Sequence, residues 1–190
     1  MRYGSFVFKK SEIESFLSEL DRLSQEENII LEIDIYGGCA FLLAYESRFS
    51  THDVDAIIKP SEEGWRLVEK VAEKLGLPDD WMNSDVFQFL SPVAPRKEAL
   101  RKLDTKYDNL RVSTPSASYL LAMKAIACRP GHSSDEADLK FLIQKMGISS
   151  TDEIQGHIDR FYPDCILEPR NRVRIAGLIE EVSDREKKSK

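Results

Sequence analysis

The sequence predicts an α+β fold, in which a small sheet is flanked by helices and a helical C-terminal part follows. Three short apolar segments with β-type character, at residues 29–36, 53–58 and 107–113, predict the strands. Amphipathic segments with apolar residues at helical spacing alternate with these strands. From residue 114 onward the patterns are helical, so the sheet is expected in the first part of the chain.

The first helix is expected at residues 10–24. Ser11 can serve as its N-cap, and Glu14 follows at the capping-box spacing. The apolar residues of this segment form one stripe: Ile13, Phe16, Leu17, Leu20 and Leu23. This stripe predicts that the helix packs on the sheet.

Two glycines, Gly37 and Gly38, stand where the first strand ends. Glycines at such a position let the backbone turn and come close to a ligand without a Cβ in the way. Backbone amides exposed there can hold a phosphate. A helix is expected to continue from Gly38 to about Tyr45.

Asp53 and Asp55 open the second strand. Residues i and i+2 of a strand point to the same face, about 6 to 7 Å apart, so the two carboxylates are expected to aim together. Two such carboxylates can hold Mg²⁺. The order of the glycine pair and this acidic pair predicts a site for a metal and a nucleotide.

The middle of the chain is expected to continue with a helix over residues 61–75, closed by Gly76 as a C′ glycine. Residues 85–90 are expected to form a short strand. A short helix is expected over residues 97–103, ahead of the third strand.

A long apolar helix is expected to begin at Thr114-Pro115, with the proline in its first turn. Lys124 falls on the apolar face of this helix. A buried ammonium needs a partner because its desolvation costs several kcal/mol. A carboxylate cluster or a nucleotide phosphate would supply one, and the alternative is a lysine whose head reaches solvent past short neighbours.

Three further helices are expected over residues 134–146, 151–162 and 169–182. Asp135 and Asp138 lie one turn apart near the start of the first of these. They can be ordinary first-turn acids that favour the helix dipole, or Asp138 can pair with Lys124.

We expect three parts of the chain. Residues 1–113 form the α/β core, residues 114–182 form a helical part packed on it, and residues 183–190 form a disordered tail.

Composition excludes several classes of protein. The 190 residues carry 27 basic and 33 acidic side chains, a net charge of −6, so a general polycationic surface for duplex nucleic acid is not expected. Three scattered cysteines and three scattered histidines argue against a disulfide framework and against a zinc site. No apolar stretch approaches the about 20 residues that span a bilayer, and the N-terminus does not fit a secretory signal, so a cytoplasmic location is expected.

Two enzyme classes are also disfavoured. The chain has no Gly-x-Ser-x-Gly nucleophile elbow and no Gly-x-x-x-x-Gly-Lys-Ser/Thr phosphate loop.

The order of these motifs resembles the polymerase-β-type nucleotidyltransferase superfamily. More narrowly, residues 28–165 resemble the small bacterial abortive-infection, toxin-type (AbiEii-like) nucleotidyltransferases. The segments that carry this resemblance are Gly37-Gly38-Cys39-Ala40, Arg48 with Ser50-Thr51, Asp53-Val54-Asp55 and Leu121-Ala122-Met123-Lys124.

The resemblance implies a nucleotidyltransferase-type sheet and a Mg²⁺-dependent enzyme. Such an enzyme moves a nucleoside monophosphate from an NTP to RNA, with tRNA as one candidate, or to a protein hydroxyl, and can be the toxin of a toxin-antitoxin system with an antitoxin protein as partner. The alternative is a catalytically silent nucleotidyltransferase-like domain that serves as a binding or antitoxin module.

The resemblance also implies roles for individual residues. Asp53 and Asp55 are expected to hold the metal and to be catalytic, together with Lys124 and Asp138. The residues expected to bind the nucleotide are Gly37, Gly38, Arg48, Ser50 and Thr51.

The superfamily carries a third acid on a neighbouring strand, and its identity here stays open between Asp108, Asp135 and Asp138. Asp108 begins the third strand, but Arg111 and Ser113 stand further along it where an acid would be expected.

Overall fold

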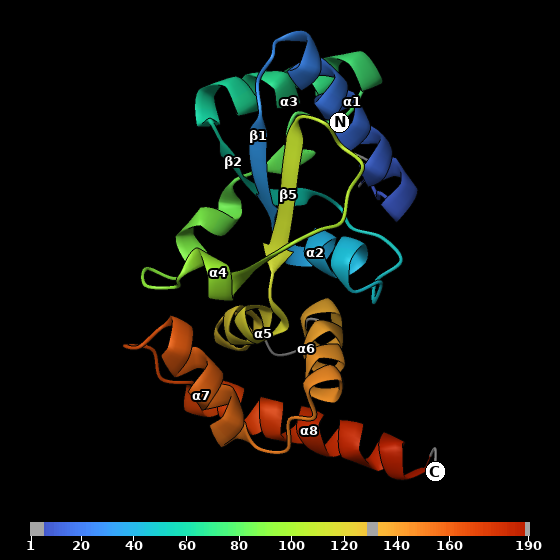
Figure 1. The fold of residues 1–190 in the computed structure, drawn as a ribbon. Coiled ribbons are helices and arrows are strands. Elements are labelled where there is room, and N and C mark those ends of the chain that lie inside the picture. The colour runs from blue at the N-terminus through green and yellow to red at the C-terminus, as the bar shows by residue number, and fades with distance from the viewer. Residues whose placement is uncertain (1–5, 129–132, 189–190) are drawn as a thin grey trace. The chain divides into compact units, whose positions relative to one another are not determined.

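The computed structural model describes residues 6–128 and 133–188 (Figure 1). The chain forms two compact units. The first comprises Met1–Gln88 with Leu100–Pro115, and the second comprises Phe89–Ala99 with Ser116–Lys190. Residues 89–99, which the sequence places in the α/β core, therefore belong to the helical unit.

A five-stranded mixed sheet forms the centre of the first unit, as the fold class predicts. Its order is β3-β2-β1-β5-β4. Strand β1 pairs antiparallel with β2 and parallel with β5, while β2 pairs parallel with β3 and β4 antiparallel with β5. The strands are β1 (Leu31–Ile35), β2 (Val54–Lys59), β3 (Met82–Asn83), β4 (Leu100–Lys102) and β5 (Leu110–Pro115).

One face of the sheet is apolar and is packed with α1 (Lys10–Glu26) and α3 (Ser61–Leu75) (Figure 1). Full burial of one such aliphatic side chain contributes about 1.5 to 3 kcal/mol. The strand residues of this cluster are Leu31, Ile33, Ile35, Val54, Ala56, Ile58, Met82, Leu110 and Val112. Because strand residues alternate between faces, the residues between these point to the opposite face of the sheet.

The N-cap of helix α1 lies two residues before the predicted one. Lys9 is the N-cap, and its backbone N–H donates to the Glu12 carboxylate at 2.8 Å, so the prediction of Ser11 as N-cap is wrong. The preceding residue, Phe8, is fixed by backbone pairing with Thr51, and the helix starts directly after this anchor. The predicted C-terminal glycine of α3 is confirmed, because Gly76 has a φ of 65°.

The region after α3 differs from its prediction. Residues Asp85–Phe89 form a 3₁₀ helix, η1, where a strand was expected. The Asn83 side chain accepts a hydrogen bond from the Asp85 N–H at 2.9 Å, which turns the chain at this point. The expected helix over residues 97–103 is confined to α4 (Arg96–Ala99), because residues 100–102 pair with β5 as strand β4.

Pro115 ends strand β5 and does not begin the following helix. Ser116 caps that helix, α5 (Ala117–Ile126), and its hydroxyl accepts from the Tyr119 N–H at 3.3 Å. The predicted proline at the first helical position is therefore wrong, because pairing with Leu100 keeps Pro115 extended.

The second unit is helical. Helix α5 packs against α6 (Ser133–Met146) and α7 (Thr151–Phe161), and α8 (Pro169–Lys188) runs across α6 and α7 (Figure 1). None of the described helices is long and apolar enough to cross a membrane.

Helix α8 continues through residues that the sequence predicts as a tail. Residues 183–188 are helical, while residues 189–190 lie outside the described part of the chain. The burial of Ile179 and Val182 anchors the helix just before this extension. The extension itself is rich in glutamate, lysine and arginine, which have high helix propensity.

Candidate functional site

Gly37 lies directly against the carboxylate of Asp55. Gly37 begins α2 (Gly37–Ala44) immediately after β1 and has a φ of +57°. A Cβ placed on Gly37 would lie 2.0 Å from Oδ2 of Asp55. A side chain at this position would therefore strain the backbone and displace the carboxylate.

Gly38 makes room for two other predicted site residues. A Cβ on Gly38 would lie 2.7 Å from Nη1 of Arg48 and 2.9 Å from Oγ1 of Thr51. The Arg48 guanidinium also lies over the Phe41 ring, 5.8 Å from its centre. The two glycines thus bring an acidic group, a guanidinium and a hydroxyl together at the start of α2.

Asp53 is held just before β2. The Asn83 amide donates to Oδ2 of Asp53 at 3.2 Å, and the Thr51 hydroxyl donates to the Asp53 carbonyl at 3.1 Å. Asp53 and Asp55 are each partly exposed. Burial raises the pKa of the Cys39 thiol, and the negative charges of Asp53 and Asp55 raise it further.

Ser50 lies in the same loop as Arg48 and Thr51 and is partly exposed. The predicted nucleotide-binding residues of the first unit therefore gather around one glycine turn. Asn83 was not among the predicted site residues, and β3 brings it to Asp53 through a parallel pairing with β2.

The donor set of this turn suits Mg²⁺. Among the residues that the structure describes, no group of three His, Cys, Asp or Glu side chains is placed to hold a metal ion. Mg²⁺ in nucleotide sites is commonly bound by one or two carboxylates together with substrate phosphates. Asp53 and Asp55, with Gly37 leaving room for the Asp55 carboxylate, fit that kind of site.

Asp108 lies at the opposite end of the sheet from Asp55. It precedes β5, whose first residue Leu110 pairs with Leu31 at the start of β1. Asp55, on β2, lies beside the other end of β1, where its carbonyl accepts a hydrogen bond from the Tyr36 N–H at 2.8 Å. Asp108 is therefore wrong as the third acid of this site.

The described sheet carries a buried acid that the sequence reasoning did not single out. Asp34 is 5% exposed and lies on β1, opposite Ile57 of β2 and Ser113 of β5. Its register places it on the same face as Asp55. The signal in the sequence was a second carboxylate, after Glu32, among the apolar residues of this strand; a buried carboxylate is costly unless it is satisfied.

Lys124, in the second unit, is held by two carboxylates. Its Nζ lies 2.8 Å from Oδ2 of Asp138 and 3.1 Å from Oδ1 of Asp135. Only 17% of the Lys124 side chain and 2% of the Asp138 side chain are exposed. The predicted carboxylate partner of the buried lysine is confirmed, and the ion pair joins α5 to α6.

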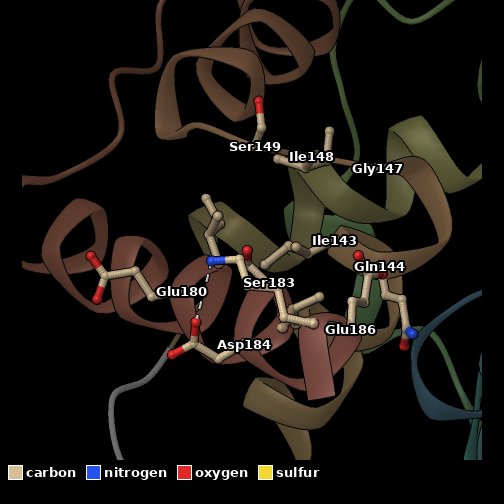
Figure 2. Close-up of a pocket in the computed structure, with 12 residues that line it drawn as sticks. Ile143, Gln144, Gly147, Ile148, Ser149, Glu180, Ser183, Asp184 and Glu186 are labelled. Carbon is tan, nitrogen blue, oxygen red and sulfur yellow. Dashed lines mark ion pairs between the residues drawn. The ribbon is translucent and has the colours of Figure 1, made fainter. Parts of the chain in front are cut away.

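A cavity of about 500 Å³ in the second unit lies among α6, the loop after it and α8 (Figure 2). Its floor includes Ile143 and Ile148, and its α8 side carries the acids Glu180, Asp184 and Glu186. None of the described residues lining it is a predicted site residue. Acidic side chains disfavour a triphosphate, so this cavity does not compete with the glycine turn as a nucleotide site.

Comparison with known families agrees with this geometry. Residues 11–154 match the model of a family described as nucleotidyltransferases of unknown function (DUF6036). No curated protein and no solved structure matches the chain. The matched region covers well over half of the chain and contains the glycine turn, the Asp53 and Asp55 pair and the Lys124 ion pair, so the chain belongs to this nucleotidyltransferase family.

Proposed function

We propose that the protein is an active Mg²⁺-dependent enzyme that transfers a nucleoside monophosphate from an NTP to a hydroxyl group. The observation that carries the proposal is the close approach of Asp55 to Gly37 and of Arg48 to Gly38. The two adjacent glycines of one turn thereby lie against a metal-binding carboxylate and a phosphate-binding cation.

In this proposal the acceptor hydroxyl attacks the α-phosphate and pyrophosphate leaves. Asp53 and Asp55 hold Mg²⁺, which would neutralise charge on the phosphates. Arg48 binds phosphate oxygens, and the N-terminal amides of α2 add hydrogen-bond donors. The hydroxyls of Ser50 and Thr51 border the same turn and are assigned to nucleotide binding.

Lys124 and Asp138 are proposed as catalytic residues from their resemblance to the toxin-type enzymes. The carboxylates of Asp135 and Asp138 fix the position of the Lys124 ammonium. A cation held in this way loses less conformational entropy when it binds a phosphate, because its long side chain is already ordered. Lys124→Arg keeps the charge and changes its position, so we expect transfer to fall while nucleotide binding is largely retained.

The test incubates the purified protein with each labelled NTP, Mg²⁺ and either total RNA or a protein lysate. We expect label to appear in one acceptor fraction. Asp53→Asn and Asp55→Asn should each lower transfer by at least about 100-fold, as expected for loss of metal-held charge stabilisation. Asp108→Asn is the matched control, because Asp108 is an exposed acid at the other end of the sheet.

Transfer that is absent in the wild type, or undiminished in both aspartate variants, would sink the enzymatic proposal. Loss in Asp108→Asn equal to that in Asp55→Asn would show that the assay reports general acidity or folding.

We further propose RNA, with tRNA as the first candidate, or a protein hydroxyl as the acceptor, and a role as the toxin of a bacterial toxin-antitoxin pair. Support comes from the resemblance of Arg48, Asp53, Asp55 and Lys124 to toxin-type enzymes. Expression of the wild type in bacteria should slow growth, and Asp55→Asn should not. A growth rate that is identical for the two proteins contradicts the toxin role.

A catalytically silent binding or antitoxin module is the second candidate. It is favoured by one observation, that the described residues contain no group of three acids able to hold a metal. It predicts that the protein binds an NTP with or without Mg²⁺ and transfers no label to any acceptor.

A further inference from the structure

Phe49 is the most exposed of the large apolar side chains in the described chain. Its exposure is 96%, in the loop that joins α2 to β2. Burial of a phenylalanine side chain contributes about 1.5 to 3 kcal/mol, and an exposed one lacks this contribution. An exposed phenylalanine in a well-anchored loop therefore indicates a binding partner.

The loop that carries Phe49 is fixed at several points. On one side, the Ser47 N–H donates to the Phe41 carbonyl at 3.2 Å. On the other, Thr51 forms a backbone bridge with Phe8, with N–O distances of 2.7 and 2.9 Å. Phe8 itself is only 3% exposed, so the bridge ties the loop to the core.

The position of Phe49 follows from these anchors. It directly follows Arg48, whose guanidinium lies against Gly38, and it stands two residues before Thr51, whose hydroxyl lies against the same glycine. Neighbouring Cα atoms are about 3.8 Å apart, so the ring is carried on the residue next to the one whose guanidinium is assigned to phosphate binding.

The chemistry of this placement selects a flat, polar-edged ring as the ligand. The residues on both sides, Arg48 and Ser50, are polar, and Arg48 is a fixed cation suited to phosphate. A nucleobase joins a flat apolar face to a phosphate through one sugar, which suits an exposed ring beside a cation. Stacking on an aromatic side chain is also tolerant of base identity.

We propose that Phe49 is a stacking platform for a nucleobase at the glycine turn. This inference rests on the proposed function. The base can come from the incoming NTP or from the end of an RNA acceptor, and the test separates these two sources.

The test measures two equilibrium affinities in the presence of Mg²⁺ for the wild type, Phe49→Ala and Phe49→Trp. The first ligand is each NTP as an analogue that cannot be cleaved at the α-phosphate, and the second is a short single-stranded RNA. Phe49→Ala should weaken one of the two at least about fivefold, the lower end of what loss of one stacked base costs. Phe49→Trp should restore it, because the larger ring keeps the stacking face.

The matched control is Phe87→Ala, which removes another exposed ring of the first unit, 71% exposed, from η1. It should leave both affinities unchanged. A loss confined to the NTP assigns the base to the incoming nucleotide, and a loss confined to RNA assigns it to the acceptor; both outcomes support the stacking role.

Two outcomes overturn the inference and distinguish it from the proposed function. If Phe49→Ala binds both ligands like the wild type while Asp55→Asn still abolishes transfer, the stacking role is wrong and the enzymatic proposal stands. If the wild type neither binds an NTP nor transfers label, both fall together.

Discussion

A single glycine determines whether the candidate site can form. Gly37 combines a φ of +57° with a position 2.0 Å from Asp55 Oδ2, measured from where a Cβ would stand. Gly76 has a similar φ of +65°, but no atom lies within 4 Å of its Cβ position. The two positions therefore separate backbone strain from displacement of the carboxylate.

We expect Gly76→Ala to cost about 1 to 2 kcal/mol of stability, the price of a left-handed residue with a Cβ. Gly37→Ala should cost more than this and should also abolish nucleotidyl transfer, because Asp55 must move. Urea unfolding of both variants, together with the transfer assay, tests the difference. Equal stabilities with full activity in Gly37→Ala would show that the carboxylate does not need the space.

At the residue scale, the sequence predicts a partner most clearly for a charged side chain on an apolar helix face. Lys124 on an apolar helix face called for a carboxylate, and the structure supplies Asp135 and Asp138. Such prediction is weakest where the partner comes from a distant strand. Asp34 was missed because strand register, which brings it beside other residues, is not visible in local spacing.

At the scale of elements, the Lys124 ion pair links α5 to α6. Removing one member of a buried pair leaves the other charge uncompensated, which costs about 3 to 5 kcal/mol. Lys124→Met leaves two carboxylates facing each other in a buried place, whereas Asp138→Asn leaves Lys124 still paired with Asp135.

We therefore expect Lys124→Met to destabilise the protein more than Asp138→Asn does, and the double variant to cost less than the sum of the two. Urea unfolding of the two single variants and the double variant measures this coupling. Additive costs would contradict a direct interaction.

Helices α1 and α3 are joined by surface ion pairs. The guanidinium of Arg66 and the ammonium of Lys70, whose Nζ lies 2.8 Å from Glu27, together lower the pKa of Glu27 to about 2, with Arg66 the larger cause. Because the folded-state pKa lies below the ordinary value of 4.5, the stabilisation is present above that value. It is lost as the pH falls from 4.5 toward 2.

Glu27→Gln should therefore lower the urea midpoint slightly at pH 7 and leave it unchanged relative to the wild type near pH 2. High salt should reduce the difference at pH 7, because the pair is exposed. Glu69→Gln, on an exposed position of α3, is the control. A Glu27→Gln effect that is the same at both pH values would exclude the ion pairs as its cause.

At the scale of the whole molecule, the chain divides into two compact units. Both tryptophans, Trp65 and Trp81, belong to the first unit, and Trp81 is only 1% exposed. The helices α5, α6, α7 and α8 belong to the second.

We expect guanidinium unfolding followed by tryptophan fluorescence to report the first unit alone, and far-UV circular dichroism to report both. We expect the two transitions not to coincide, because the chain divides into two compact units. Superimposable curves would show that the chain unfolds as one cooperative body.

The sequence by itself determined the α+β class, the strands at the glycine pair and at Asp55, and the nucleotidyltransferase family. These features depend on local periodicity and on the order of motifs along the chain, both of which are written in neighbouring residues. The same local signals identified Lys124 as a buried charge that needs a partner.

Only the tertiary structure decided which acids meet. Asp108 looked suitable at the start of a strand, but the parallel pairing of β5 with β1 carries it to the far end of the sheet from Asp55. Pro115 and residues 100–102 became strand for a similar reason, since pairing between segments satisfies their backbone and overrides local helical preference. The pairing of distant segments decides the positions of these residues, and the register of that pairing cannot be inferred from the local pattern of one sequence.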